Sequence, residues 1–230
     1  MAISYETLLS EIIPMVPGCS DTLIENAIRS ALIELCEKAE VYQAELDPTS
    51  TVSGIYEYEL DAPSQTTIHK ILYITYKGTD LEPLTPQLLE QRAPKWRDNP
   101  STPEFFVKQS SSTVWLVPIP SASEANSVIV RAILRPTHSS TSCADDIIND
   151  YRDTIVNGAL FRLLRTPSKD WTDFSAASVY SALFLEGITE AERRARSADT
   201  GVARKVNYGG IHTRRRFRRN NYGTYKPRNW

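Results

Sequence analysis

The stretch that decides the fold is SDTLIENAIRSALIELCEKAEVYQAEL, residues 20–46. Its apolar side chains return every three or four positions, at Leu23, Ile24, Ala27, Ile28, Ala31, Leu32, Leu35, Cys36 and Ala39. This spacing is typical of an amphipathic helix. Ser20 stands where an N-cap is expected, and Asp21 and Glu25 follow it near the helix N-terminus. We therefore predict a helix over residues 20–45 that buries one face against a partner.

Two later stretches show the same period. CADDIINDYRDTIVNGALFRLLRT (143–166) predicts a helix over 143–166, and KDWTDFSAASVYSALFLEGITEAERRARS (169–197) predicts another over 170–198. We expect one apolar stripe on the second of these, formed by Phe174, Ala177, Val179, Tyr180, Leu183, Phe184 and Ile188. A shorter helix is expected before Pro14. Because each helix needs a partner for its apolar stripe, we expect them to pack as one bundle.

Between these helices, residues 52–135 change to strand patterns. GIYEYEL (54–60) alternates apolar and acidic side chains, and EFFVKQSSSTVWLV (104–117) reads as two strands around a serine turn. NSVIVRAILRP (126–136) predicts a last strand ended by Pro136. A short helical stretch is expected around Gln87 to Arg92. Several strands without long helices favour a small antiparallel sandwich or barrel.

The predicted fold class is α+β: a helical bundle with an inserted, mostly antiparallel β-domain and an extended C-terminal arm. The expected division is residues 1–48 for the N-terminal helices, 49–137 for the inserted β-domain, 138–200 for the helical pair that completes the bundle, and 201–230 for a basic arm.

The net charge of −2 conceals two oppositely charged parts. Residues 201–230, GVARKVNYGGIHTRRRFRRNNYGTYKPRNW, hold nine of the 26 Lys and Arg and no Asp or Glu. The first 200 residues keep 17 basic side chains against 28 acidic ones, a net charge of −11. Such asymmetry predicts that the C-terminal arm meets an anionic partner, either nucleic acid, a membrane surface or an acidic protein.

Metal and cofactor chemistry finds little support. The three cysteines, Cys19, Cys36 and Cys143, form no CxxC pair, and Cys36 lies on an apolar helical stripe where a buried thiol is expected. The histidines His69, His138 and His212 fall in three different segments. We therefore expect no metal site and no cofactor, and synthesis in a reducing cytosol. The first residues carry no basic segment typical of a signal peptide, and no apolar run approaches a membrane span.

Four aspartates, at 145, 146, 150 and 153, are the candidates for catalysis. Paired carboxylates can bind a cation or act as acid and base. The favoured alternative is that Asp145 and Asp146 stabilise a helix start while Asp150 and Asp153 form a solvated face. No nucleotide-binding or nucleophile motif accompanies them, so we predict that the protein is not an enzyme. Of the tryptophans, Trp115 is expected in the core, whereas Trp96 could serve a contact or local packing.

The basic arm has three possible roles: a solvated disordered tail, a nucleic-acid-binding element, or an anchor on a protein partner. Arginines can grip phosphates or carboxylates, and aromatic side chains can stack on bases or fill pockets. The residues that carry these properties are Arg204, Lys205, Tyr208, Arg214, Arg215, Arg216, Phe217, Arg218, Arg219, Tyr222, Tyr225, Arg228 and Trp230.

Several phrases resemble the head-to-tail adaptor proteins of tailed bacteriophages, also called head-completion or tail tubular proteins. They are PGCSDTLIENAIRSALIELCEKAEVYQAELDP (17–48), GIYEYEL (54–60), KGTDLEPLTP (77–86) and TPEFFVKQSSSTVWLVPIP (102–120). The resemblance extends over nearly the whole chain, through the order of an early helix, a β-insert, a helical pair and an extended arm.

This resemblance implies a structural protein of the virion neck, assembled in the host cytoplasm and without contact to a membrane. Such adaptors form a ring, usually of twelve copies, whose arms run along the portal protein and whose other face receives a tail or nozzle protein. Double-stranded DNA passes through the ring without specific binding, and an acidic wall would repel it. The arm residues would then dock on portal carboxylates, because a grip on phosphates would slow DNA ejection.

Overall fold

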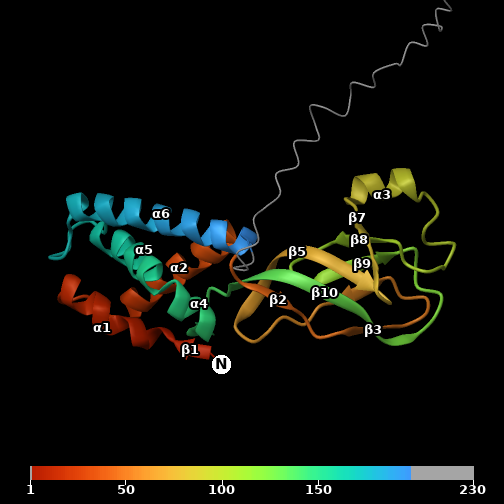
Figure 1. Ribbon diagram of the computed structural model, residues 1–230, viewed down its shortest axis with the longest axis horizontal. Coiled ribbons are helices and arrows are strands. Elements are labelled where there is room, and N and C mark those ends of the chain that lie inside the picture. The colour runs from red at the N-terminus through yellow and green to blue at the C-terminus, as the bar shows by residue number, and fades with distance from the viewer. Residues whose placement is uncertain (1, 198–230) are drawn as a thin grey trace, which may run out of the picture. The chain divides into compact units, whose positions relative to one another are not determined.

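The computed structural model describes residues 2–197. All of them belong to the first of two units into which the chain divides, which ends at Asp199. The predicted α+β fold class is confirmed: helices gather in a bundle, and mostly antiparallel strands form a β-domain beside it (Figure 1). The predicted arm, residues 201–230, lies outside the described residues.

The helical segments of the described chain are η1 (Tyr5–Leu8), α1 (Leu9–Ile12), η2 (Ile13–Met15), α2 (Asp21–Ala39), α3 (Pro86–Arg92), α4 (Asp145–Asp150), α5 (Arg152–Leu164) and α6 (Phe174–Ser197). Its strands are β1 (Ala2–Ser4), β2 (Gln43–Glu45), β3 (Thr49–Thr51), β4 (Glu57–Glu59), β5 (Thr66–Tyr76), β6 (Thr79–Asp80), β7 (Glu82–Pro83), β8 (Phe105–Lys108), β9 (Thr113–Val117), β10 (Glu124–Pro136) and β11 (Ser142–Ala144).

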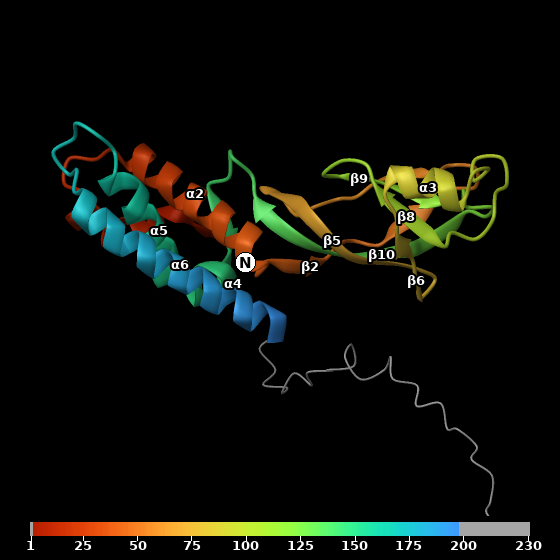
Figure 2. The ribbon, with the colours of Figure 1, turned by 90° about the horizontal axis from the view of Figure 1, so that it is seen from above.

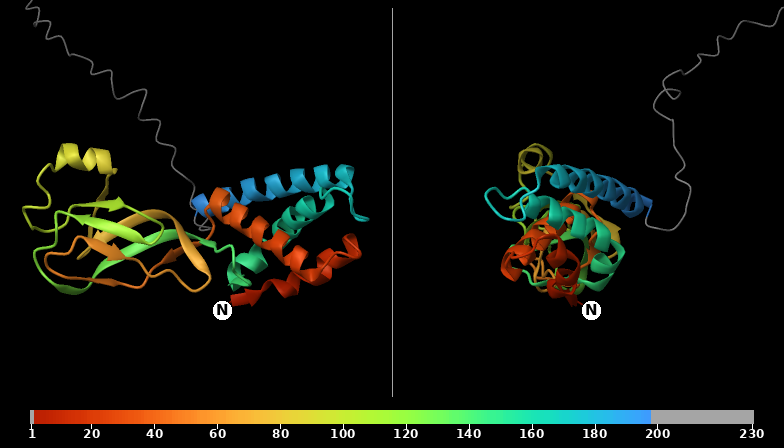
Figure 3. Two further views of the ribbon diagram at one scale, coloured as in Figure 1. Left: turned by 180° about the vertical axis from the view of Figure 1, so that it is seen from behind. Right: turned by 90° about the vertical axis from the view of Figure 1, so that its left-hand side faces the viewer.

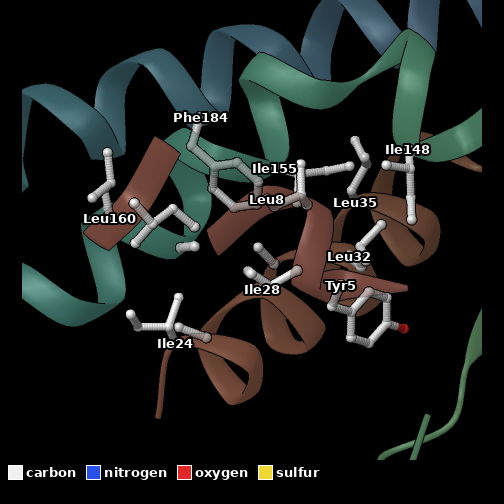
Figure 4. Close-up of a cluster of buried hydrophobic side chains, with 14 of the residues drawn as sticks. Tyr5, Leu8, Ile24, Ile28, Leu32, Leu35, Ile148, Ile155, Leu160 and Phe184 are labelled. Atoms are coloured by element: carbon white, nitrogen blue, oxygen red, sulfur yellow. The ribbon is translucent and has the colours of Figure 1, made fainter. Parts of the chain in front are cut away.

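The bundle has one continuous hydrophobic core, built by both ends of the described chain. Helix α5 packs against α6 and α2, and α1 packs against α2 and α5 on the side away from α6 (Figure 1). Phe184 points from α6 into this core toward side chains from α2 and α5 (Figure 4). The period of three to four residues that predicted these helices thus gives most of the buried face of α2, including the fully buried Cys36, whereas Leu23 of the predicted stripe is 36% exposed.

One predicted helix boundary is wrong, and one predicted helix is divided. The helix expected over 20–45 ends at Ala39, because Glu40 adopts the left-handed conformation with a φ of 53° and the chain then turns into β2. Ser20 does occupy the N-cap position, but its side chain makes no capping bond. The helix expected over 143–166 is present from Asp145 to Leu164, but it is divided into α4 and α5 at Tyr151.

The β-domain is a sandwich of two sheets with a hydrophobic core between them. One sheet has the order β2–β10–β5–β6, with β3 also paired to β10, and the other has the order β4–β9–β8–β7. The predicted hairpin is confirmed as the antiparallel pair β8–β9, whereas β7 and β8 run parallel. Strand β10 ends at Pro136 as predicted. Figure 2 shows β2, β5 and β10 leading from the bundle into this domain.

A second, smaller core surrounds Trp96. Trp96 is only 3% exposed. It packs edge-on against Tyr56, with ring centroids 5.2 Å apart, and beside the half-buried Trp115. The guanidinium of Arg97 lies over the Trp96 ring, 4.3 Å from its centroid. Trp96 therefore serves local packing, which holds the proline-rich segment between α3 and β8 on the sheet.

The bundle and the β-domain lie side by side along the molecule (Figure 3). Polar contacts join them. Arg135 on β10 pairs with Glu37 on α2, and Lys70 on β5 pairs with Glu40 at 2.7 Å. The ring of Tyr42 packs against the cores of both regions. The two regions therefore meet where α2 passes into β2.

Candidate functional site

All thirteen predicted arm residues, from Arg204 to Trp230, lie outside the described residues. That these residues form one docking surface stays a prediction. The described chain does show the helix that precedes them, since α6 ends at Ser197.

The last turns of α6 form an exposed surface of paired charges. Glu190 accepts hydrogen bonds from Arg193 Nη2 at 2.7 Å and from Arg194 Nε at 3.2 Å. These bonds lower the pKa of Glu190 to about 2, and the bond from Arg193 has the larger effect. Arg196 pairs with Glu192. Cations near a helix C-terminus interact favourably with its dipole, so this end of α6 is stable while its arginines remain open to a partner.

Two clefts bring some of the four aspartates together, but each cleft also holds arginines: Asp146 and Asp150 line one, and Asp150 and Asp153 line the other. Asp145 and Asp146 begin α4, as predicted, and Asp145 Oδ1 accepts a hydrogen bond from Asn149 at 2.5 Å. Asp150 and Asp153 are exposed. A cleft of about 350 Å³ between α4, β10 and α6 is lined by charges of both signs, including Asp146, Asp150, Arg131 and Arg194.

The remaining chemical groups are separate or inert. Burial raises the pKa of the Cys36 thiol well above its usual value and that of Cys143 to about 11, so neither is activated as a nucleophile. His69 lies on β5 and His138 follows β10, while His212 lies beyond the described range. Across residues 2–197, no group of three or more His, Cys, Asp and Glu is placed to hold a metal ion. The prediction that the chain is not an enzyme is not tested by this geometry.

None of the helices within residues 2–197 combines the length and apolar character that crossing a membrane requires.

The sequence pattern did not predict the clearest candidate contact surface, the outer face of α6, because α6 has two apolar faces. Its buried residues are Ala177, Phe184, Ile188 and Ala191. Three members of the predicted single stripe face outward instead: Phe174 is 65% exposed, Val179 58% and Leu183 42%. A helical wheel would have separated Val179 and Leu183 from Phe184. No charged residue stands between Phe174 and Leu185, so this surface lacks the charges that usually cover a solvated helix.

A second exposed apolar surface lies at the end of the bundle where α6 begins. Ile13 is 43% exposed and Met15 47%. Met15 also lines a cleft of about 380 Å³, together with Trp171 and Tyr180. Two exposed apolar surfaces on one small bundle indicate protein–protein contacts.

Comparison with known proteins places the chain in a family. The model of the SU10 adaptor protein family matches residues 4–205, which span the whole bundle and the β-domain. The chain therefore belongs to the SU10 adaptor protein family, a family of structural phage adaptors, and is a virion component of that type. None of the curated proteins compared with it matches. The family match ends at Lys205, so most of the basic arm lies beyond it.

Proposed function

We propose that the protein is the head-to-tail adaptor of a tailed phage: copies form a ring that joins the portal protein to a tail or nozzle protein. The observation that carries this proposal is the family match over residues 4–205. The proposed ring has about twelve copies, assembles in the host cytoplasm, and lets double-stranded DNA pass through its lumen.

The division of charge supports passage of DNA. The first 200 residues carry a net charge of −11. A ring made from such bodies repels the phosphates of DNA, and this repulsion keeps DNA from adhering to the wall. The protein needs no catalytic group for this role, which agrees with the scattered titratable side chains of the bundle.

The arm, residues 201–230, is proposed to dock on the portal. Its five arginines between 214 and 219 repel one another at this spacing, so anionic partners are needed to hold them together. Guanidinium groups form forked bonds with carboxylates. Phe217, Tyr222, Tyr225 and Trp230 supply aromatic anchors, which commonly carry most of the energy of an interface.

Truncation after Thr200 tests the role of the arm. The truncated chain should fold and remain soluble, because the described bundle and β-domain end before the arm. It should fail to bind purified portal protein in a pull-down and fail to complete heads in an assembly assay. Completion of heads at the normal yield would refute a docking role for the arm.

The basic composition of the arm also favours a second candidate function, binding of nucleic acid. Cations interleaved with aromatic side chains can follow a phosphate backbone and stack on bases. In that case the full-length protein should bind DNA with an affinity that falls steeply with salt, and the truncated chain should not. Retained portal binding by the truncated chain, with loss of DNA retention in heads, would favour this candidate over portal docking.

A further inference from the structure

We propose that the β-domain can pivot on the bundle, and that Gln65 is a clamp that holds the two regions in one position. The hinge consists of the two segments by which the chain passes between the regions, residues 40–42 and residues 137–141. Gln65 directly precedes β5 and binds the second segment. The proposal goes beyond the proposed function and does not depend on it, because it concerns how two regions of one chain are held together.

The two regions share little besides these segments. Within residues 2–197, the chain passes between them twice, from α2 to β2 and from β10 to β11. Helix α2 lies against β10, but the hydrophobic cores of the regions are separate, and the half-buried Tyr42 is the contact between them. Regions without a large shared core are expected to move relative to each other unless specific contacts hold them.

The side chain of Gln65 binds the end of the second segment that belongs to the bundle. Its Oε1 accepts hydrogen bonds from the backbone N–H of Thr141 at 2.8 Å and from that of Ser142 at 3.1 Å. Two N–H donors require the oxygen of the amide, not its nitrogen, which fixes the orientation of the Gln65 side chain. Ser142 begins β11, which pairs with β1 in the bundle. The Gln65 side chain is therefore tied to the bundle.

The backbone of Gln65 binds the other end of the same segment. Its carbonyl oxygen accepts a hydrogen bond from the N–H of Thr137 at 2.9 Å, directly after β10 ends at Pro136. Gln65 leads into β5, where Thr66 is the partner of Pro136. Its φ of 62° lies in the left-handed region, which is uncommon for a residue with a side chain. One residue thus bonds to both ends of the segment.

The middle of the segment is fixed to the bundle. Arg29 Nε donates a hydrogen bond to the carbonyl oxygen of Ser140 at 2.6 Å, and the hydroxyls of Tyr5 and Ser140 share one at 2.8 Å. The N–H of Tyr5 donates to the carbonyl oxygen of Thr141 at 3.1 Å. Ser140 is fully buried. Ser140 and Thr141 therefore move with the bundle, and Gln65 reaches across to them from the β-domain.

The clamp can open without unfolding either region. Gln65 is exposed, so water can replace the bonds that its side chain makes. A hydrogen bond that is exchanged for one with water contributes little net stability. Tyr5 and Ser140 are buried and stay in place. Loss of the Gln65 side chain should therefore free the hinge and leave both folds intact.

A cleft on the other side of β10 leaves room for the movement. Its volume is about 350 Å³, and Gln43 and Arg131 line it from the β-domain while Asp146 and Arg194 line it from the bundle. Strand β10 lies between β2, which contains Gln43, and β5, which follows Gln65. Opening the clamp on one side of β10 would let the β-domain turn toward the cleft on the other. Hinges of this kind use a few residues at the ends of elements.

Distances between spin labels in the full-length protein test the clamp. One label is attached at Gln87→Cys on α3, at the end of the β-domain far from the bundle, and the other at Ser178→Cys on α6 (Figure 1). Cys19→Ser removes the partly exposed thiol, and Cys36 and Cys143 are buried. With Gln65 in place, double electron–electron resonance should give one narrow distance distribution.

Three variants separate the side chain of Gln65 from its backbone. Gln65→Gly removes the clamp and suits the positive φ, so the distribution should become at least twice as wide. Gln65→Glu keeps an acceptor oxygen and should restore the native width. Asn126→Gly is the matched control, because Asn126 is exposed and has a φ of 49° but lies on β10 within the β-domain. Circular dichroism should be the same for all three.

Four outcomes would overturn the clamp. A native width for Gln65→Gly would show that the side chain holds nothing. Equal broadening by Gln65→Glu would show that the acceptor oxygen is not what holds the regions, and equal broadening by Asn126→Gly would assign the effect to backbone freedom. A broad distribution with Gln65 in place would show that the regions pivot freely. Because the measurement uses the free protein, none of these outcomes depends on whether a ring forms.

Discussion

The bundle and the β-domain are assembled from the chain in opposite ways. The core of the bundle combines residues 5–39 with residues 143–191. The buried residues of the core between the two sheets all lie within residues 46–134, which form one uninterrupted segment. The bundle therefore forms only after distant parts of the chain meet, which carries a larger loop-closure cost, whereas the β-domain can complete its core within itself.

The two regions also pack differently. In the bundle, three helices cross so closely at Gly158 that an added Cβ would lie 2.6 Å from Phe184 and 2.9 Å from Ala31. In the β-domain, the smaller core around Trp96 is filled by broad aromatic rings, and the ring centroids of Trp96 and Trp115 lie 6.1 Å apart. This contrast predicts that the bundle tolerates changes of volume less well.

The largest effect should come from Phe184→Ala in the bundle. Phe184 is 2% exposed and joins α6 to the shared core. Its removal should lower the free energy of unfolding of the bundle by about 3–5 kcal/mol, through lost burial and a cavity. Because the cores are separate, helical ellipticity at 222 nm should be lost at lower denaturant, while the near-ultraviolet signal of Trp96 and Trp115 keeps its midpoint.

Leu116→Ala is the matched change in the β-domain, where Leu116 is fully buried. It should move the aromatic signal and leave the helical midpoint in place. Coincident shifts of both signals in both variants would show that the two regions unfold as one cooperative unit, and would contradict the comparison drawn above.

Gly158→Ala should have the next largest effect. The new methyl would contact Phe184 and the Cβ of Ala31, and the latter cannot move without its helix. We expect a loss of about 1–3 kcal/mol from overpacking. Gly187→Ala is the control, because its closest neighbours are side-chain atoms of Thr154. The double variant Gly187→Ala with Thr154→Ala should recover stability, as measured by urea denaturation, whereas adding Thr154→Ala to Gly158→Ala should not.

Many of the helices and strands of the two regions were predictable from local sequence patterns. The period of three to four residues located α2, α5 and α6, and the serine turn located the β8–β9 hairpin, because these features depend on residues close in sequence. The end of α2 was not predictable in this way. Residues 40–45 suit a helix, but Gln43 to Glu45 pair with β10, and Glu40 turns the chain to reach it.

The contact surface was predictable only in part. The sequence shows that Val179 and Leu183 are apolar, but which apolar face of α6 is buried depends on where α5 and α2 lie. That is a property of tertiary packing, which no period within one helix reveals. The basic arm was visible from charge alone, since nine cations without an acid need no structure to be recognised.

Alkaline pH should weaken the bundle. Burial raises the pKa of Tyr5 to about 12, although its hydroxyl bonds to Ser140, and burial raises that of Cys143 to about 11. Both folded pKa values exceed the unfolded ones, so the unfolded state releases protons first. Stability should be complete below about pH 9 and fall between pH 9 and 12, by about 1–2 kcal/mol for Tyr5. When thermal unfolding is measured across this pH range, Tyr5→Phe should no longer show the fall in stability above pH 10. An unchanged fall would contradict the assignment of this effect to Tyr5.

The smallest effect should be the coupling between the two regions through their ion pairs. Arg135 and Glu37 are each 32% exposed, whereas Lys70 and Glu40 are 54% and 37% exposed. Partly exposed pairs contribute about 0.2–1 kcal/mol, and screening by salt is weaker for the less exposed pair. A double-mutant cycle with Arg135→Ala and Glu37→Ala should therefore give the larger coupling energy, one that persists in 1 M salt, while the Lys70 and Glu40 cycle should vanish there. Each pair joins α2, or the residue after it, to the β-domain. If a pair stabilises both unfolding transitions equally, the contacts at this junction transmit stability between the two regions although their cores are separate. A coupling seen in the helical transition alone would leave the β-domain independent of the bundle.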